Sequence, residues 1–385
     1  MDNAATTRMR EEVISIMFNA MCTLYANPSS SHALGKRVRR AIEDARNTIA
    51  NGLGCAASEL VFTSGGTESD NLALLGHARA NKVVGRHIIT SAIEHSAVLN
   101  ATHKLENEGF EVTYIDVTDD GVVDLDELAA AIRPDTILIS IMLVNNETGV
   151  IQPIQKIVEI ARAKNITVHT DAVQAIGKIQ VDVETLGVDL MSLTAHKIHG
   201  PKGIGCLYVR AGTPISPLLY GGHQEKAIRP GTENTANILG FAKAFELAIG
   251  NLVEINTIIS ELRNALEDTI TGHVPDAIIN GKNAQRVSTT TNISFPTLDG
   301  TVLHRLLNRE RLCVTSGSAC ESDSLEPSHV LTAMGIDAHL AEASVRFSLA
   351  EDTTSEDIDK THAIVCDIVS RMRAGFSKET THEHT

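Results

Sequence analysis

Short apolar runs alternate with longer amphipathic stretches along most of this chain, and the alternation predicts strands separated by helices. The runs expected to be strands cover residues 59–65, 86–96, 111–117, 136–145, 166–174, 190–197 and 203–210. The stretches with a helical period between them cover residues 67–81, 97–109, 124–132 and 153–165. Because short apolar strands separated by helices are typical of βαβ units, we expect an α/β domain with a mainly parallel seven-stranded sheet between helices.

The pattern changes after a long helical stretch at residues 233–271. The segments beyond it are TTTNISFP, the helical GTVLHRLLNRE, LCVTSGS, PSHVLTAMG, ASVRFSLA and a final helix. These segments mix strands and helices without the βαβ order, which predicts a smaller α+β domain. We therefore expect a large domain at residues 8–255, and a small domain at residues 256–385 that also takes in residues 1–7.

Composition narrows the class of protein. The 385 residues are 43% hydrophobic and carry a net charge of −15, so the basic signature of a nucleic-acid-binding protein is missing. No apolar run reaches the ~18 residues of a membrane span, and MDNAATTRMREE has no apolar core of a secretory signal. Six scattered cysteines are typical of a reduced intracellular protein. We expect a cytoplasmic protein that binds neither nucleic acid nor membrane.

A glycine turn follows the first apolar strand, in TSGGTES. Gly65 and Gly66 allow a tight turn, and Thr67 opens the helix that follows. The backbone N–H groups and the dipole at such a helix start favour an anion, so the turn is a candidate phosphate site. The alternative is an ordinary glycine turn with a threonine cap.

Polar residues also follow the other predicted strands, where open parallel sheets bind their ligands. His95 follows the second strand, Asn146 follows IMLVN, and Asp171 and Gln174 lie in DAVQ. A buried aspartate at a strand end requires a partner, which could be a cation, a metal or a protonated ring nitrogen. A histidine in a surface loop is the alternative for His95.

Lys197 lies beside His196 in SLTAHKIHGPKG, directly after an apolar strand. A desolvated lysine has a lowered pKa and can form a covalent bond with an aldehyde. The alternatives are a surface lysine and a metal site through His196 and His199. An anion-binding turn, a histidine that can stack on a ring, an acidic partner and a lysine together fit pyridoxal phosphate.

Cys320 lies in TSGSACESDS, a run of small and acidic residues with no second cysteine close enough for a CxxC pair. A thiol in such a segment is either incidental or reactive. Cys206 lies within a predicted strand, and Cys313, just before this run, is expected to be buried.

The chain as a whole resembles the cysteine desulfurases of the NifS/IscS type, which are class V aminotransferases of the pyridoxal-phosphate-dependent fold type I. The resemblance rests on DNAATT, NPSSSH, TSGGTES, EH at 94–95, VNNETG, DAVQ, AHKIHGPKG, GGHQEKAIRPGTEN, TSGSACESDSLEPSHVL and VRFSL. Two departures are a start at MDNAATT without a preceding apolar stretch, and GGT where many relatives have GAT.

The resemblance implies roles for the residues around the cofactor. Lys197 holds pyridoxal phosphate covalently, His95 stacks on its ring, Asp171 pairs with the ring nitrogen and Gln174 binds the ring hydroxyl. The residues implied to bind the phosphate are Gly66, Thr67, Thr194, His196 and, from the other subunit of a homodimer, Thr232.

The resemblance also implies the substrate and the reaction. Arg346 would hold the carboxylate of L-cysteine, Asn146 would bind the substrate, and Asn27 would line its pocket. The thiolate of Cys320 would take the substrate's sulfur as a persulfide and release alanine. An iron–sulfur scaffold or another acceptor protein would then receive the sulfur. No metal is expected, except that Cys320 could transiently ligate an iron–sulfur cluster.

Three alternatives remain open at this stage. A related class V aminotransferase would share Lys197, Asp171 and His95 without needing Cys320. Selenocysteine lyase activity could occur as a side reaction, and an inactive docking platform would not need to keep Lys197 or Cys320. Nitrogenase assembly, general iron–sulfur assembly and tRNA thiolation are all open as destinations of the sulfur.

Overall fold

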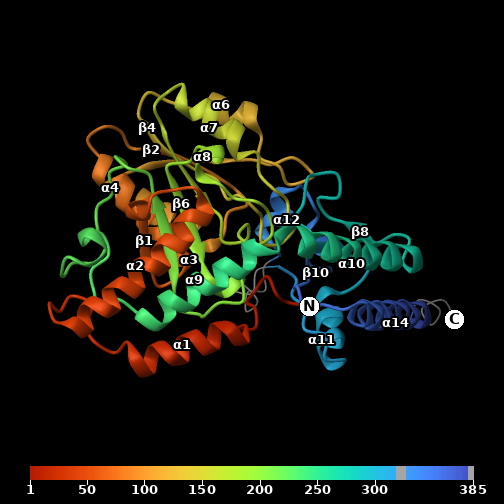
Figure 1. Cartoon of the computed structure of the whole chain (residues 1–385). Helices are drawn as coiled ribbons and strands as arrows, with labels where there is room; N and C mark the ends of the chain where they lie inside the picture. Colours follow the sequence, from red (N-terminus) through yellow and green to blue (C-terminus); the bar gives the residue numbers. More distant parts are fainter. Residues whose placement is uncertain (318–326, 380–385) are drawn as a thin grey trace.

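The structure is a computed structural model of the chain, and it describes residues 1–317 and 327–379 (Figure 1). Its larger sheet has seven strands in the order β1-β7-β6-β5-β4-β2-β3. These strands are β1 (Leu60–Thr63), β2 (His87–Ser91), β3 (Glu111–Ile115), β4 (Thr136–Ser140), β5 (Thr167–Asp171), β6 (Leu190–Thr194) and β7 (Gly205–Val209). β7 is the one strand of this sheet that runs opposite to the other six, so the predicted mainly parallel seven-stranded sheet is confirmed.

Helices cover both faces of this sheet. Neighbouring side chains of a strand point to opposite faces, and here the side chains on both faces are buried. Ile88 of β2 belongs to one hydrophobic cluster and Ile89 to another, and Leu138 and Ile139 of β4 divide in the same way. The cluster with Ile89 includes buried side chains of α2, α7 and α9, whereas the cluster with Ile88 includes those of α4 and α5.

Nine α-helices lie between the N-terminus and residue 250: α1 (Glu11–Thr23), α2 (Ala33–Leu53), α3 (Gly66–Asn71), α4 (His77–Asn81), α5 (Ser96–Asn107), α6 (Leu125–Ala131), α7 (Ile154–Arg162), α8 (Val183–Leu186) and α9 (Thr235–Gly250). The short helical turns are η1 (Ala57–Glu59), the π-turn η2 (Leu72–Gly76), η3 (Ala195–Lys197) and η4 (Gln224–Ala227). The predicted helix at 67–81 is therefore a continuous run of α3, the π-turn and α4.

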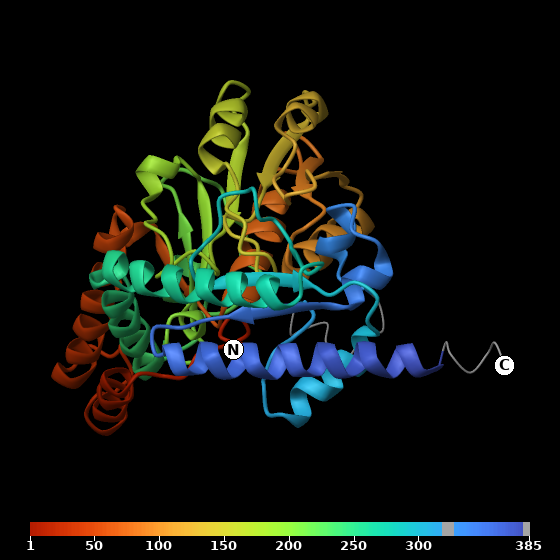
Figure 2. The ribbon, with the colours of Figure 1, turned by 90° about the vertical axis from the view of Figure 1, so that its right-hand side faces the viewer.

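A second, antiparallel sheet has the order β10-β9-β8. Its strands and the helices around it are α10 (Leu252–His273), β8 (Ile278–Ile279), β9 (Thr290–Ser294), α11 (Gly300–Arg309), α12 (His329–Ala333), α13 (Ala338–Glu342), β10 (Ser344–Ser348) and α14 (Ser355–Glu379). In Figure 2, α10 and α14 run side by side along this sheet, and their facing side chains share one hydrophobic cluster. Met1 packs against the same cluster. The predicted domain boundary at residue 255 falls inside α10 and stays a prediction.

Two local expectations were wrong. The single helical stretch expected at 233–271 is two helices, because the chain turns at Asn251, whose φ of −120° and ψ of 21° are not helical. Cys313 is exposed rather than buried. Leu312 and Val314 on either side of it pack inward, and the alternation of an extended segment turns Cys313 outward.

The two sheets meet at the carboxyl ends of the parallel strands. Ser348, at the end of β10, bridges Asp2, and Val287 N donates a hydrogen bond to the carbonyl oxygen of Gly149. The N-terminal residues thus run between the sheets and bring the backbone at Ala4 close to η3. None of the helices within residues 1–317 and 327–379 has the length and apolar character that a membrane span requires.

Candidate active site

A pocket of about 150 Å³ lies where the parallel strands end. Its lining consists of Ala4, Ala5, Gly66, Thr67, Asp70, His95, Met142, Val144, Asn146, Asp171, Val173, Gln174, Thr194, His196, Lys197 and Arg346. Every predicted site residue except Asn27, Thr232 and Cys320 is in this set. The structure therefore brings together side chains that follow β1, β2, β4, β5 and β6, and adds one from β10 of the smaller sheet.

Lys197 reaches the pocket from η3, the turn that directly follows β6. Its Nζ donates hydrogen bonds to the carbonyl oxygens of Ala4 at 2.5 Å and Ala5 at 2.7 Å. The N-terminal segment thus directs the ammonium group into the pocket. Gln174 binds the same segment, because its Nε2 lies 2.9 Å from the Ala4 oxygen.

Asp171 ends β5 and is buried. Its Oδ1 accepts a hydrogen bond from Val173 N at 2.8 Å. Burial raises the pKa of Asp171 to about 6, although the hydrogen bond and the charge of Lys197 oppose the rise. A cationic ring nitrogen bound against this carboxylate would offset its desolvation, so the site fits a protonated pyridine.

His95 caps the N-terminus of α5, with its Nδ1 accepting a hydrogen bond from Ala97 N at 3.1 Å. An acceptor at Nδ1 makes Nε2 the donor of the neutral ring, so the cap sets both the tautomer and the orientation of the imidazole. The ring lines the pocket in this orientation.

The residues predicted to bind an anion from this chain, Gly66, Thr67, Thr194 and His196, all line the pocket. A Cβ on Gly66 would lie 2.8 Å from Val173 Cγ2, so a larger residue at the start of α3 would require the Val173 side chain to shift. His196 Nδ1 lies 3.2 Å from Thr6 Oγ1, and burial lowers the pKa of His196 to about 4. The imidazole is therefore neutral near pH 7 and can donate one hydrogen bond to an anion.

Arg346 enters from β10 and is 1% exposed. Its Nη1 donates to the carbonyl oxygen of Asn146 at 2.9 Å, and its Nη2 donates to Asp2 Oδ1 at 2.8 Å. Its Nε is buried and has no hydrogen-bond partner within the described residues. A buried guanidinium with an unsatisfied donor at a pocket wall is suited to bind a carboxylate.

Two further polar residues of the site were missed from the sequence. Asp70 of α3 lines the pocket, and its buried Oδ1 lies 3.7 Å from Nε2 of His169 on β5. Burial raises the pKa of Asp70 well above its usual range, and Asp171 adds to the rise. Burial also lowers the pKa of His169 to about 3, while Ser140 and Ser192 hydroxyls bond its two ring nitrogens at 2.8 and 3.0 Å.

A sequence signal for His169 did exist. It precedes Asp171 by two residues, so both side chains point to the same side of β5. Nothing comparable identifies Asp70, because it meets His169 only through the packing of α3 on the sheet.

Three predicted residues lie elsewhere. Asn27 is exposed in the loop between α1 and α2, where its Oδ1 accepts a hydrogen bond from Ser29 N at 2.8 Å. Thr232 is exposed and lines a different pocket, together with Ser64. Cys320 lies outside the described residues. The roles assigned to these residues stay predictions.

The described residues on both sides of Cys320 approach the same side chain, that of Glu147. A Cβ on Gly317 would lie 2.8 Å from Glu147 Oε2, and Ser328 Oγ donates a hydrogen bond to that oxygen at 2.5 Å. Glu147 follows Asn146, which lines the pocket. The chain therefore leaves and rejoins the described structure beside this site.

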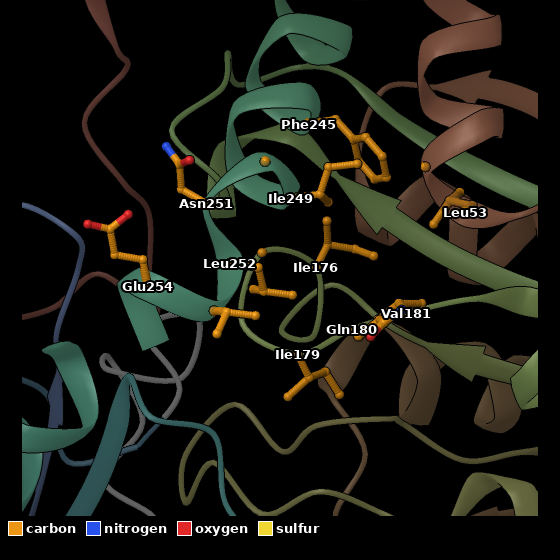
Figure 3. A pocket seen from close by; sticks show the side chains of 14 residues that line it. Leu53, Ile176, Ile179, Gln180, Val181, Phe245, Ile249, Asn251, Leu252 and Glu254 are labelled. Carbon is orange, nitrogen blue, oxygen red and sulfur yellow. The ribbon is translucent and has the colours of Figure 1, made fainter. Parts of the chain in front are cut away.

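A larger pocket, of about 520 Å³, lies between the end of α2, residues 176–181 and the junction of α9 with α10 (Figure 3). Most of its side chains are apolar, as Phe245 and Ile249 illustrate, and Glu254 is the one titratable side chain in its lining. It lacks a set of converging polar groups, so the smaller pocket is the candidate active site.

Comparisons with known proteins agree with this geometry. A family model described as aminotransferase class-V matches residues 1–361. A cysteine desulfurase IscS of Methanosarcina thermophila is 49% identical over 97% of this chain and 92% of its own length. A cysteine desulfurase IscS of Dictyoglomus turgidum is 47% identical over 97% of this chain and 95% of its own length.

Solved structures give the same result. A NifS-like protein superimposes with a TM-score of 0.90 at 39% identity, covering 96% of this chain and 98% of that one. A structure described as SspA in complex with cysteine has a TM-score of 0.79 at 37% identity, covering 92% of this chain and 99% of that one.

Proposed function

This chain belongs to the class-V aminotransferase family and to the cysteine desulfurases within it, and we propose that it takes sulfur from L-cysteine in the pocket at Lys197. L-Cysteine and the Cys320 thiol would give L-alanine and a Cys320 persulfide, so that no external oxidant or reductant is needed. One observation supports this most strongly: Lys197, Asp171 and Arg346 converge on one pocket from three separate elements.

Pyridoxal phosphate is the cofactor that this pocket fits. Asp171 supports the choice, because its raised pKa marks a carboxyl group that a cationic ring nitrogen would stabilise. Gly66 and Thr67 line the pocket at the start of α3, where backbone N–H groups suit the phosphate. When bound, the cofactor supplies an aldehyde for Lys197 and a ring that draws electrons from the substrate's α-carbon.

The chain's own groups would orient the substrate. Arg346 would bind the α-carboxylate, using the Nε that has no partner among the described residues. Its contacts with Asn146 and Asp2 hold the guanidinium plane in place before substrate arrives. Because the guanidinium is already oriented, less entropy is lost when the substrate binds.

Proton transfer is assigned to Lys197 and His95. The Lys197 amine lies on the pocket wall near the Asp171 carboxylate, and it would accept and return the proton of the substrate's α-carbon. His95, with Nδ1 engaged by Ala97 N, would present Nε2 as the group that exchanges a proton with the sulfur side of the substrate.

Cys320 is proposed as the sulfur acceptor on the strength of its sequence context and its flanks. Gly317 and Ser328, which bracket the segment, both lie against Glu147 beside the pocket. The thiolate would attack the substrate's sulfur, so that the carbon–sulfur bond breaks and its electron pair stays with the carbon that becomes alanine's methyl group.

A homodimer and a sulfur-acceptor protein complete the proposal. Large apolar side chains are exposed on α1, including Phe18 at 66% and Met21 at 59%, and Tyr220 is 90% exposed. Phe18 and Met21 are three residues apart and so lie on one face of α1, where they offer an apolar contact. A second copy would cover them and bring its Thr232 to the phosphate. Sedimentation of the purified chain at several concentrations would show whether it dimerises.

The decisive experiment measures alanine and sulfide formed from L-cysteine and a thiol reductant. The natural chain should form both products, Cys320→Ser should form no sulfide, and Cys313→Ser should match the natural chain because Cys313 is an exposed thiol away from the pocket lining. If the natural chain binds pyridoxal phosphate but leaves cysteine intact and aminates a keto acid, it is an aminotransferase instead.

A further inference from the structure

A second group of chemically reactive side chains lies between α10 and α14. His273 is the last residue of α10, and His362 and Cys366 lie one turn apart on α14. His273 Nδ1 is 3.2 Å from His362 Nε2, and the two rings have their centroids 4.6 Å apart. One ligand atom of each residue, including the Cys366 sulfur, lies within 4.8 Å of the other two.

These separations are close to those of ligands around one tetrahedral metal ion. Metal–nitrogen bonds of ~2.0–2.1 Å and metal–sulfur bonds of ~2.3 Å place two nitrogens ~3.4 Å apart and a nitrogen and a sulfur ~3.6 Å apart. The observed 3.2 Å between the two ring nitrogens is close to the first value. The Cys366 sulfur lies within 4.8 Å of the ring nitrogens and would have to come closer to reach the second value.

The backbone that carries these residues is held by a packed core. Ile270, one turn before His273, is fully buried, as are Val365 and Val369 on either side of Cys366. Side chains of α10 and α14 share this cluster, so the two helices cannot separate without exposing it. His362 and Cys366, four residues apart, lie on the same side of α14. The three ligands are thus positioned before any ion binds.

The protonation of these residues suits metal ligands. Burial lowers the pKa of His362, and His273 lowers it further, whereas Asp359 opposes the change. Burial raises the pKa of Cys366, so an ion would have to displace its proton. His273 Nδ1 also lies 2.9 Å from the carbonyl oxygen of Thr269, and an ion would compete with that contact.

We propose that His273, His362 and Cys366 bind a transition-metal ion of the Zn²⁺ class, with the fourth position open to water. Two imidazoles and one thiolate, without a carboxylate, favour such an ion over Mg²⁺ or Ca²⁺, which require oxygen ligands. None of the three residues lines the pocket at Lys197, so the ion would join the end of α10 to α14 rather than take part in catalysis.

The test uses Co²⁺ as a visible substitute for Zn²⁺, added to the cofactor-loaded full chain. The natural chain should bind one equivalent with a thiolate-to-cobalt absorption band, which Zn²⁺ abolishes by displacement. Cys366→Ser should lose the band, and His273→Gln should bind at least about 10-fold more weakly. His273 is exposed, so this variant should fold even if Cys366→Ser does not.

Three control variants separate this site from other thiols and histidines. Cys320→Ser, Cys313→Ser and a chain ending at residue 379, which lacks the two histidines of the tail, should all keep the band. The proposal is overturned if the natural chain shows no such band, if Cys366→Ser keeps it in full, or if Cys320→Ser or the shortened chain abolishes it.

Discussion

The pocket at Lys197 and the cluster of His273, His362 and Cys366 use similar side chains in opposite surroundings. In the pocket, Asp171 is 7% exposed and Arg346 1% exposed, whereas His273 lies open to solvent. Burial raises the pKa of Asp171 there, and the backbone N–H of Val173 donates a hydrogen bond to its carboxyl group. The cluster is less buried, because His273 is exposed and His362 and Cys366 are only partly buried.

The difference shows where function lowers stability. Buried polar groups in the pocket are set for a bound partner, so the protein without its cofactor carries their desolvation cost. The ligands of the cluster are less buried than the groups of the pocket, so their desolvation cost is smaller, and an ion bound there adds stability. Substitutions in the pocket should therefore lower activity while they raise stability. Substitutions in the cluster should alter neither activity nor stability until an ion is present.

The largest effect is expected from Lys197→Ala. The pocket would lose the amine that holds the cofactor and moves a proton, so the rate of alanine formation should fall at least about 10³-fold. Lys202→Ala is the matched control, because Lys202 lies five residues further on and is exposed. Activity within tenfold of the natural chain would show that this pocket is not the reaction site.

A smaller effect on the same pocket is expected from Arg346→Lys. A lysine ammonium cannot bond Asn146, Asp2 and a substrate carboxylate with the geometry of a guanidinium. Losing a charge-assisted hydrogen bond of ~1.5–3 kcal/mol should lower kcat/KM by about 10–100-fold. The loss should be mainly in KM, since the groups at the reacting carbon stay. An unchanged KM would exclude carboxylate binding by Arg346.

Asp171→Asn sharpens the comparison by separating stability from binding. The pKa of Asp171 is raised from 3.8 to about 6 in the folded protein. The folded protein therefore loses stability as pH rises through this range, because a buried carboxyl group has to ionise. The asparagine cannot ionise and can still accept the hydrogen bond from Val173 N. The cofactor-free variant should therefore be more stable than the natural chain at pH 8, by on the order of 2 kcal/mol, and about equal at pH 4.

Urea unfolding of the cofactor-free proteins at both pH values measures this change, and a titration with pyridoxal phosphate should show weaker binding by the variant. A variant that is less stable at pH 8, or that binds the cofactor unchanged, would contradict the role given to Asp171.

The smallest effect is expected from His273→Gln with metal removed by a chelator. His273 is exposed and its ring bonds only Thr269 and His362 in the described structure, so the free energy of unfolding should change by less than ~0.5 kcal/mol. Added Zn²⁺ should raise the midpoint of unfolding of the natural chain and leave this variant unchanged. A large loss of stability without metal would mean that the two rings are a structural contact.

Most of the architecture could be predicted from the sequence, because a buried parallel strand needs a short run of apolar residues and such runs stand out along the chain. β4 shows this, since every residue in it is buried and its centre is Ile137, Leu138 and Ile139. Prediction was less successful where the signal is a single residue, as at Asn251, where one helical stretch became two. Cys313 shows the same limit, because its exposure depends on which neighbours of the segment pack inward.

The sequence by itself determined the sheet, the order of its motifs and the residue types that gather where its strands end. The tertiary structure alone decided which residues come together across the chain. Asp70 meets His169 because α3 packs on the sheet, and His273 meets Cys366 because α10 packs on α14. The reason is physical: strand and helix periods are local properties of the chain, whereas a contact between distant residues depends on how whole elements pack.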